Sequence, residues 1–173
     1  VVMTGDFKID PTASDGMIDL ARFGELGNQG VLALLADSTN VERPGYTMSE
    51  RTVGETFHHY FQKAEGRIFV AMFASNIHRM QMVIDSALRY GRRVCFIGRS
   101  MVNVSRVAMQ IGELHIPEEC IIDQDDLDQY PDHEVLVMTT GSQGEPMAGL
   151  TRMAYAEHRK LQIRQSDMVI ISA

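Results

Sequence analysis

Short apolar runs, each bounded by turn-forming residues, recur along this chain and restrict its fold more than any other feature. Most of them are continuous in hydrophobicity and do not alternate with polar residues, which is typical of strands covered on both faces. In order, the runs are VVMTG, VLALLAD, RIFVAMF, RVCFIG, CIID, EVLVMTT and MVIISA. The sequence therefore predicts a sheet whose strands are mostly interior.

Segments with helical periodicity separate the later runs. From Arg67 onward the expected order is strand, helix, strand, helix, strand, short helix, strand, helix, strand, which is typical of an α/β fold with a parallel, Rossmann-like sheet flanked by helices. The turn at Pro44 and Gly45 marks a domain boundary. The four longer helices are expected from Met48 to Ala64, from an N-cap at Ser75 to Gly91, from near Ser100 to Gly112, and from Pro146 onward.

Polar loops follow four of the predicted strands. In open parallel sheets, ligands bind outside the carboxyl ends of the strands, and helix N-termini there favour anions. Arg79 and Arg99 add positive charge, so together the loops predict a wall that holds a phosphate backbone. Taken singly, each loop also has the residues that a helix cap or a tight turn requires, so a purely structural role is sufficient to explain it. The four loops are ADSTN (36–40), FASNIHR (73–79), GRSMVN (98–103) and TTGSQGEP (139–146).

Two carboxylates, Asp6 and Asp37, also stand where apolar runs end. A partly desolvated carboxylate needs a cation, a histidine or N–H donors, and a divalent metal is one solution. A turn or cap role is the more frequent one for a single aspartate. Of the histidines, only His78 is expected near a ligand, whereas His115, His133 and His158 are interpreted as solvated surface residues.

Composition narrows the function classes. The formal net charge of −7 argues against a broad nucleic-acid-coating surface but allows a local cleft. Two cysteines are too few for a disulfide framework, and neither a membrane-spanning run nor a signal peptide is apparent, so a reducing cytoplasm and no membrane partner are expected. No Walker or G-x-G-x-x-G motif is present. Because both ends of the chain have the pattern of buried strands, we expect a piece of a longer protein.

Several blocks together resemble one family. In order they are TGDFKIDPT…DG, LLADSTN, ERPGYT.SE, FASNIHR.Q, GRSMVN and TTGSQGEPM. This string is similar to ribonuclease J, a family of bacterial RNA-degrading enzymes in the metallo-β-lactamase superfamily that carry a β-CASP domain. The resemblance extends from Gly5 to Ala173.

The resemblance implies a domain organisation and an activity. Residues 1–41 are expected to be part of a metallo-β-lactamase domain, 42–165 the inserted β-CASP domain, and 166–173 a strand returning to the first domain. The whole protein is implied to be a two-zinc ribonuclease with 5′-3′ exonuclease and endonuclease activity in rRNA processing and mRNA decay. Its implied partners are single-stranded RNA with a 5′-monophosphate, and other subunits in a homo- or hetero-oligomer.

The resemblance also assigns roles to individual residues. Asp6 is expected to bridge the two zinc ions, and Asp37 to act in catalysis by orienting a histidine that helps the leaving group depart. The loops are expected to position RNA through eight residues: Ser75, Asn76, His78, Arg99, Ser100, Asn103, Ser142 and Gln143. Phe73 is the nearest aromatic candidate for base stacking, although a core role is favoured for it.

The H-x-H-x-D-H signature and the later histidine motifs of the family are absent from this sequence. We therefore expect neither nuclease activity nor stoichiometric zinc from the isolated chain, because a zinc site normally needs three or four protein ligands. Two alternatives stay open. In the first, the whole protein is an RNA-binding or assembly subunit with a degenerate metal site. In the second, the domain is a binding module for a small phosphorylated ligand.

Overall fold

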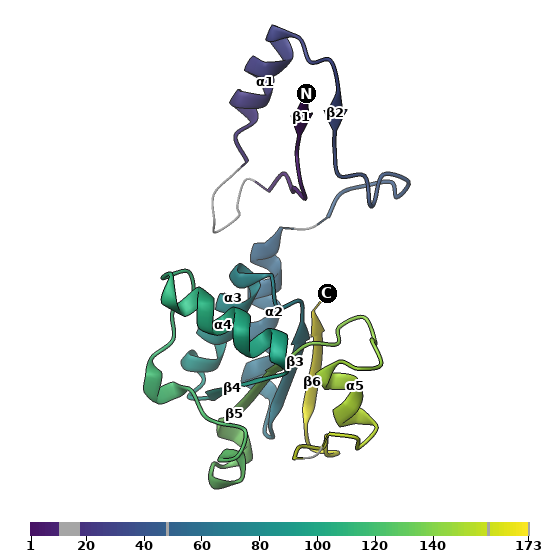
Figure 1. Cartoon of the computed structure of the whole chain (residues 1–173). Helices are drawn as coiled ribbons and strands as arrows, with labels where there is room; N and C mark the ends of the chain where they lie inside the picture. Colours follow the sequence, from purple (N-terminus) through teal and green to yellow (C-terminus); the bar gives the residue numbers. More distant parts are fainter. Residues whose placement is uncertain (11–17, 48, 159, 173) are drawn as a thin grey trace. The chain divides into compact units, whose positions relative to one another are not determined.

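The computed structural model describes residues 1–10, 18–47, 49–158 and 160–172. The chain divides into two compact units, unit 1 (Val1–Val53) and unit 2 (Gly54–Ala173), shown in Figure 1. Two predicted features lie partly outside the described residues. One is the TGDFKIDPT…DG block, from residue 11 onward, and the other is Met48, the expected start of the first long helix. None of the helices in the described ranges is long and apolar enough to cross a membrane.

The described residues of unit 1 before Glu50 form helix α1 (Leu20–Gln29) and a two-stranded sheet. Strands β1 (Val2–Met3) and β2 (Leu34–Leu35) pair in parallel, with Val2 opposite Leu34. Helix α1 (Leu20–Gln29) begins where the side chain of Asp19 accepts a hydrogen bond from the Arg22 backbone N–H.

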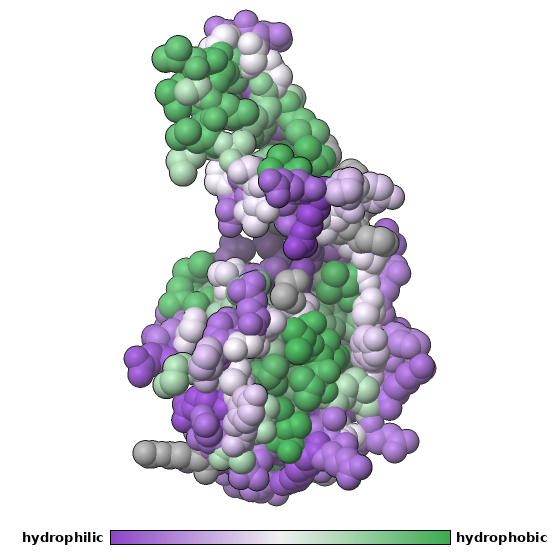
Figure 2. Space-filling view, turned by 90° about the vertical axis from the view of Figure 1, so that its right-hand side faces the viewer, coloured by the Kyte–Doolittle hydropathy of each residue, from purple (hydrophilic) through white to green (hydrophobic). Residues whose placement is uncertain are grey.

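Apolar side chains in unit 1 are largely uncovered. No residue of α1 is buried, and both residues of β2 are exposed. Leu32 is 94% exposed and Leu34 59%. Figure 2 shows apolar side chains gathered in the part of the view that unit 1 occupies. The strands of unit 1 are therefore apolar, but the described residues of this unit do not cover them with a core.

Unit 2 is built on a four-stranded parallel sheet in the order β4-β5-β3-β6. The α/β class with a parallel sheet between helices, predicted from the sequence, is confirmed. The strands are β3 (Ile68–Met72), β4 (Arg93–Ile97), β5 (Val135–Thr139) and β6 (Met168–Ser172).

Helices cover both faces of this sheet. Helices α2 (Glu50–Lys63), α3 (Ile77–Arg89) and α4 (Arg99–Gln110) bury apolar side chains such as Phe57, Met80 and Met101. On the other face, Phe69, Cys95 and Val137 form a cluster with Met153 of α5 (Gly149–Ala154) and with residues of the 122–130 and 161–163 segments. The central strands β3 and β5 are buried along their whole length, as their continuous hydrophobicity predicted.

Two buried arginines fasten the amino ends of the strands. Arg67 forms a salt bridge of 2.6 Å with Asp167, and both side chains are almost fully buried. Arg92 donates to the backbone carbonyls of Ala64, Gly66 and Val135. A buried guanidinium is tolerated only when such acceptors compensate its lost hydration. These contacts join β3, β5 and β6 across long sequence separations.

One predicted strand is wrong. The CIID run forms no strand, and only Ile121 makes an isolated bridge with Val94 of β4. The chain there passes instead through three single-turn 3₁₀ helices, η1 (Glu118–Cys120), η2 (Leu127–Gln129) and η3 (Asp132–Glu134).

Candidate functional site

Three of the four polar loops meet at one edge of the unit 2 sheet. They follow β3, β4 and β5, which are parallel neighbours or next-neighbours, so their carboxyl ends point the same way. The grouping of these three loops, expected from the sequence, is therefore present. The fourth loop, 36–40, belongs to unit 1 and is described separately below.

The loop after β3 ends in a side-chain cap. Asn76, not Ser75 as expected, is the N-cap of α3, because its Oδ1 atom accepts a hydrogen bond of 3.0 Å from the Arg79 backbone N–H. Ser75 and His78 are exposed beside it. Phe73 is 40% exposed, so its expected core role is wrong and its ring lies at the surface of this edge.

The loop after β4 is a single turn around glycine. Gly98 is the N-cap of α4, has a φ of 98° and offers no side chain to the helix N-terminus. The backbone N–H groups of that first turn therefore lack a side-chain cap. Arg99, Ser100 and Asn103 are exposed on the first turns of α4.

The loop after β5 is glycine-bearing because the chain turns back in very little space. Gly141 has a φ of 112°, and a Cβ atom there would lie 2.9 Å from Ala148 Cβ. A Cβ atom on Gly149 would overlap Thr139 Oγ1. The Leu150 N–H donates a hydrogen bond of 3.0 Å to the Thr140 carbonyl and closes the loop. The glycines thus allow α5 to start directly against the end of β5.

The two polar residues predicted at the tip of this loop differ in access. Gln143 is exposed, and its backbone N–H donates to the Glu145 carboxylate. The Ser142 hydroxyl is enclosed and has no hydrogen-bond partner in the part of the chain that the structure describes. Contact between Ser142 and a ligand would therefore require this loop to shift.

A pocket of about 510 Å³ lies between the loops after β4 and β5, and we call it the basic pocket. It brings together a cation from the start of α4, a cation from α5 and a histidine beyond α5, with no carboxylate among the lining residues. That composition favours an anion. The lining residues are Ile97, Gly98, Arg99, Ser100, Asn103, Thr140, Met147, Gly149, Arg152 and His158.

A tight reversal after α5 holds His158 beside Arg152. Ala156 has a φ of 57°, and the backbone N–H groups of Glu157 and His158 both donate to the Arg152 carbonyl, at 2.8 and 3.0 Å. Burial and the nearby charge of Arg152 lower the pKa of His158 below its ordinary value, so the ring is neutral at neutral pH. His158 was expected to be a solvated surface residue, and the structure instead places it in the basic pocket.

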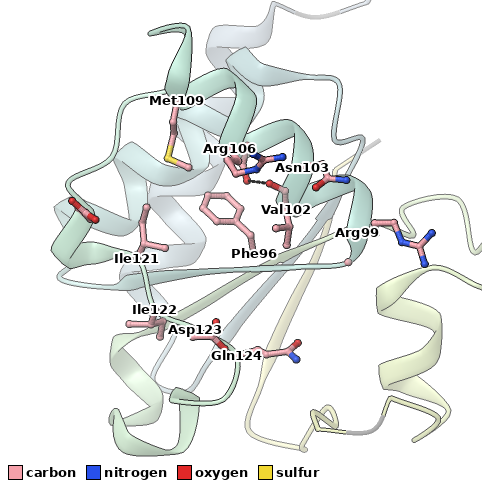
Figure 3. A pocket seen from close by; sticks show the side chains of 13 residues that line it. Phe96, Arg99, Val102, Asn103, Arg106, Met109, Ile121, Ile122, Asp123 and Gln124 are labelled. Carbon is pink, nitrogen blue, oxygen red and sulfur yellow. Dashed lines mark hydrogen bonds between the residues drawn. The ribbon is translucent and has the colours of Figure 1, made fainter.

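A second, wider pocket of about 890 Å³ lies on the other side of α4, along the sheet edge formed by β4. Figure 3 shows Arg106 and Asn103 on α4 above Phe96, with Asp123 and Gln124 on the segment below. The side chain of Arg99 extends away from this second pocket, toward α5 (Figure 3). Arg99 borders both pockets, but its guanidinium points to the basic one.

In unit 1, Asp6 and Asp37 follow the two paired strands β1 and β2. The Asp37 backbone N–H donates to Thr4 Oγ1, and Asp37 Oδ1 accepts from the Thr39 hydroxyl and backbone N–H at 2.7 and 3.0 Å. The Thr39 hydrogen bonds lower the pKa of the exposed Asp37 carboxyl. These contacts keep the carboxylate ionised and fixed in a turn.

The residues present do not form a metal site by themselves. No group of three or more histidine, cysteine, aspartate or glutamate side chains in the described residues is arranged to hold an ion. Asp6 and Asp37 are suitable oxygen donors, but a zinc site needs more ligands than two carboxylates.

The fold and the site together define a class: a parallel α/β domain with a basic pocket at the carboxyl ends of its strands. The family described as "Ribonuclease J, beta-CASP domain" matches residues 65–173, and the chain belongs to the ribonuclease J family.

Curated relatives align with the whole chain. It is 46% identical to ribonuclease J of Thermus thermophilus, 45% identical to ribonuclease J of Helicobacter pylori strain J99 and 42% identical to ribonuclease J2 of Bacillus subtilis. Each alignment covers 100% of this chain but only 30%, 25% and 31% of the respective relative. The chain thus spans about a quarter to a third of the length of these relatives.

Sequence reasoning missed Arg152 and His158 as members of the site. Nothing local marks them, because they reach the pocket only through the short α5 and the reversal at Ala156. Their basic character, downstream of the glycine-bearing loop, was the only available signal.

Proposed function

We propose that this chain is the RNA-holding part of a zinc-dependent ribonuclease. The single observation that carries the proposal is the edge of the unit 2 sheet, where three polar loops and the basic pocket lie together. Membership of the ribonuclease J family supports RNA as the ligand. RNA is recognised as a single strand through its phosphates, 2′-hydroxyls and base edges, and exposed amide, hydroxyl and guanidinium groups suit those contacts.

Within this proposal the residues at the edge have separate tasks. Arg99 neutralises phosphate charge, Ser100 and Asn103 donate or accept at sugar hydroxyls, and Gln143 contacts a base or sugar from the opposite loop. Ser75, Asn76 and His78 extend the surface beyond β3. Asn76 already uses its Oδ1 atom as a helix cap, so only its amide N–H₂ remains for RNA. Ser142 joins the contacts only after the loop shifts.

Unit 1 is proposed to supply the aspartates of a catalytic centre that other parts of the whole protein complete. Asp6 is assigned as a zinc ligand and Asp37 as a positioning acid for catalysis. Two zinc ions, when bound, would activate a water molecule and stabilise charge on the scissile phosphate. Asp37 suits its task because the Thr39 hydrogen bonds hold it ionised and oriented.

The wider biology follows as part of the same proposal. The whole protein is proposed to act in the cytoplasm as an oligomer, in rRNA processing and mRNA decay, by 5′-3′ exonuclease and endonuclease cleavage of 5′-monophosphorylated RNA. Residues 1–41 and 166–173 are assigned to or toward the metallo-β-lactamase domain, and 42–165 to the β-CASP domain.

Titration with single-stranded RNA tests the binding part. The chain is mixed with oligouridylates of increasing length and with free UMP, at several salt concentrations. We expect affinity to rise with length and to fall steeply with salt, because each phosphate contact releases counterions. Equal affinity for UMP and for the longest oligonucleotide would favour a small-ligand module and refute the proposal.

A turnover assay tests the catalytic part. The isolated chain is incubated with 5′-monophosphorylated RNA and added Zn²⁺, beside a sample with a chelator. We expect no cleavage above the chelator sample, since two carboxylates without further ligands do not hold zinc against water. Chelator-sensitive cleavage by the 173-residue chain would contradict the assignment of the missing ligands to other segments.

A further inference from the structure

The one buried side chain among the described residues of unit 1 is a carboxylate. Asp10 is only 5% exposed, whereas the other described residues from Val1 to Val53 are half-buried or exposed. Burial of a carboxylate is destabilising unless hydrogen-bond donors or a cation compensate its lost hydration. The position of Asp10 therefore requires a specific partner.

That partner is the start of helix α2. The Oδ2 atom of Asp10 accepts a hydrogen bond of 3.0 Å from the backbone N–H of Glu50, the first residue of α2, across a separation of 40 residues in the sequence. The first N–H groups of a helix have no partner within the helix, and the partial positive charge there favours a carboxylate. One bond thus satisfies both a buried carboxylate and a helix N–H group.

Lys8 provides a second contact with the same residue. Its Nζ atom lies 3.1 Å from Glu50 Oε1, and the two side chains are 31% and 26% exposed. A partly exposed ion pair of this kind contributes little stability alone, but it attaches a second point of the segment to the start of α2. The next helix N–H, that of Arg51, is capped locally by Ser49 Oγ at 3.1 Å. The first turn of α2 is therefore capped by one neighbouring residue and one distant residue.

The segment attached in this way carries Asp6. Asp6 is exposed and follows Gly5, which has a φ of 61°. Before it, the Thr4 N–H donates a hydrogen bond of 3.0 Å to the Leu35 carbonyl, which joins the chain to β2. After it, Asp10 joins the chain to α2. The loop that carries Asp6 is thus held at both ends, on one side by a strand and on the other by a helix.

We propose that Asp10 is a positioning residue, which holds the loop of Asp6 against the first turn of α2, with Lys8 as the second point of attachment. The first turn, up to Val53, belongs to unit 1, and the same helix continues in unit 2. The helix through which the chain enters the proposed RNA-holding unit therefore begins at the loop of the proposed metal ligand. The inference deepens the proposed function and rests on it for the role of Asp6, although the junction itself does not depend on that role.

Three variants separate a positioning role from a simple helix cap. Asp10→Ala removes the acceptor for the Glu50 N–H. Asp10→Asn keeps an acceptor oxygen, and asparagine is as good a cap as aspartate. Asp19→Ala is the matched control in the same unit, because Asp19 caps α1 by accepting a hydrogen bond of 2.9 Å from the Arg22 N–H.

NMR relaxation and amide exchange of the 173-residue chain report the two sides of the junction separately. In Asp10→Ala we expect the backbone order parameters of residues 6–9 to fall from about 0.85 to below about 0.6. Exchange of the amides of residues 50–53 should become about tenfold faster, as for loss of a helix cap. Asp10→Asn should keep both properties of the unaltered chain. Asp19→Ala should speed exchange in α1 and leave residues 6–9 unchanged. Amides of β3 and β5 check that unit 2 remains folded in every variant.

Two results would overturn the inference. One is faster exchange at the start of α2 in Asp10→Ala with unchanged order in residues 6–9, which would make Asp10 a helix cap only. The other is a loop that is already flexible in the unaltered chain, with order parameters below about 0.6. Neither RNA nor metal is added in these measurements. Failure of the RNA titration would therefore refute the proposed function and leave the junction standing, and loss of the junction would leave RNA binding by unit 2 standing.

Discussion

Units 1 and 2 both contain parallel strands and amphipathic helices, but the strands are buried in unit 2 and exposed in unit 1. In unit 2 the strands β3 and β5 are buried along their length and two arginines tie their amino ends together. In unit 1 the strands β1 and β2 pair over two residues each, and helix α1 buries none of its residues. The apolar runs have similar hydrophobicity, so the sequence of a strand does not by itself provide a core. A core requires enough neighbouring elements to cover both faces of the sheet.

The largest expected difference is in amide exchange. Amides of β3 and β5 should exchange only through opening of the whole unit 2 core, whereas those of β1 and β2 should exchange through local opening. We expect the two sets to differ by at least about a thousandfold in protection, which corresponds to about 4 kcal/mol. Hydrogen–deuterium exchange followed by mass spectrometry measures this directly. Comparable protection in both units would mean that unit 1 has a core as stable as that of unit 2.

The next effect concerns charged pairs. Replacing Arg67 by methionine leaves the Asp167 carboxylate buried without its partner and should cost unit 2 about 3–5 kcal/mol of unfolding free energy. The matched change in unit 1, Arg22→Met, removes the exposed pair with Glu25 and should cost less than about 1 kcal/mol. Urea denaturation followed by circular dichroism checks both.

A second change on the Arg67 background provides the internal control. Adding Asp167→Leu removes the unpaired charge and should recover part of the loss. No recovery would mean that other hydrogen bonds dominate at this site: the one from Arg67 to the Gln162 carbonyl, or the one from the Arg164 N–H to Asp167, which Asp167→Leu also removes.

Glycine substitutions should have opposite signs in the two units. Gly149→Ala places a Cβ atom against Thr139 Oγ1 and should destabilise unit 2 by about 1–3 kcal/mol. Gly24→Ala, in α1, meets no atom within 4 Å and should stabilise that helix by about 0.5–1 kcal/mol. Melting curves and helical ellipticity report the two changes. If Gly149→Ala is neutral, the close approach of α5 to β5 is not a constraint on the fold.

The smallest expected effect is the pH dependence from His158. Its pKa in the folded chain lies below the unfolded value of about 6.5, because burial and Arg152 disfavour the charged ring, and Arg99 lines the same pocket. The unfolded state therefore takes up the proton first as pH falls. Stability should be full above the unfolded pKa and should decrease as pH falls toward the folded pKa. His158→Asn should lose this slope, and an NMR titration of the ring should show a midpoint below that of a histidine peptide. A midpoint above the peptide value would reverse the sign.

Much of unit 2 could be predicted from the sequence, because strands buried on both faces produce continuous apolar runs and helices between them produce a 3.6-residue period. The same reasoning was wrong at the CIID run. There the pairing with β4 is limited to the Ile121 bridge, in which the Ile122 N–H donates to the Val94 carbonyl, and a turn follows directly, in which the Asp123 side chain accepts from the Asp125 N–H. It also placed the α3 cap one residue early, since serine and asparagine are equally good N-caps and only the observed bond from the Arg79 N–H distinguishes them.

The candidate site was predictable only in part. Arg99, Ser100 and Asn103 follow a strand directly, so their place at the sheet edge follows from the topology. Arg152 lines the same pocket from α5, and His158 reaches it because Ala156 adopts a left-handed conformation that its residue type does not signal. The position of these two side chains depends on the tertiary structure, and no local sequence pattern predicts it.

The strand order of unit 2 has a consequence for how such a domain can be grafted into another protein. Strand β6, the last along the chain, pairs with β3, the first, and it ends at the carboxyl edge of the sheet. Helix α2 ends at Lys63, shortly before β3 begins at Ile68, and Figure 1 shows the start of α2 at the same end of unit 2 as the end of β6. The two ends of this domain in the chain, the start of α2 and the end of β6, therefore lie on one side of the domain, beside the loops that carry its polar groups. A domain with this strand order can be inserted into a single loop of another protein, because its two chain ends lie at the same edge of its sheet.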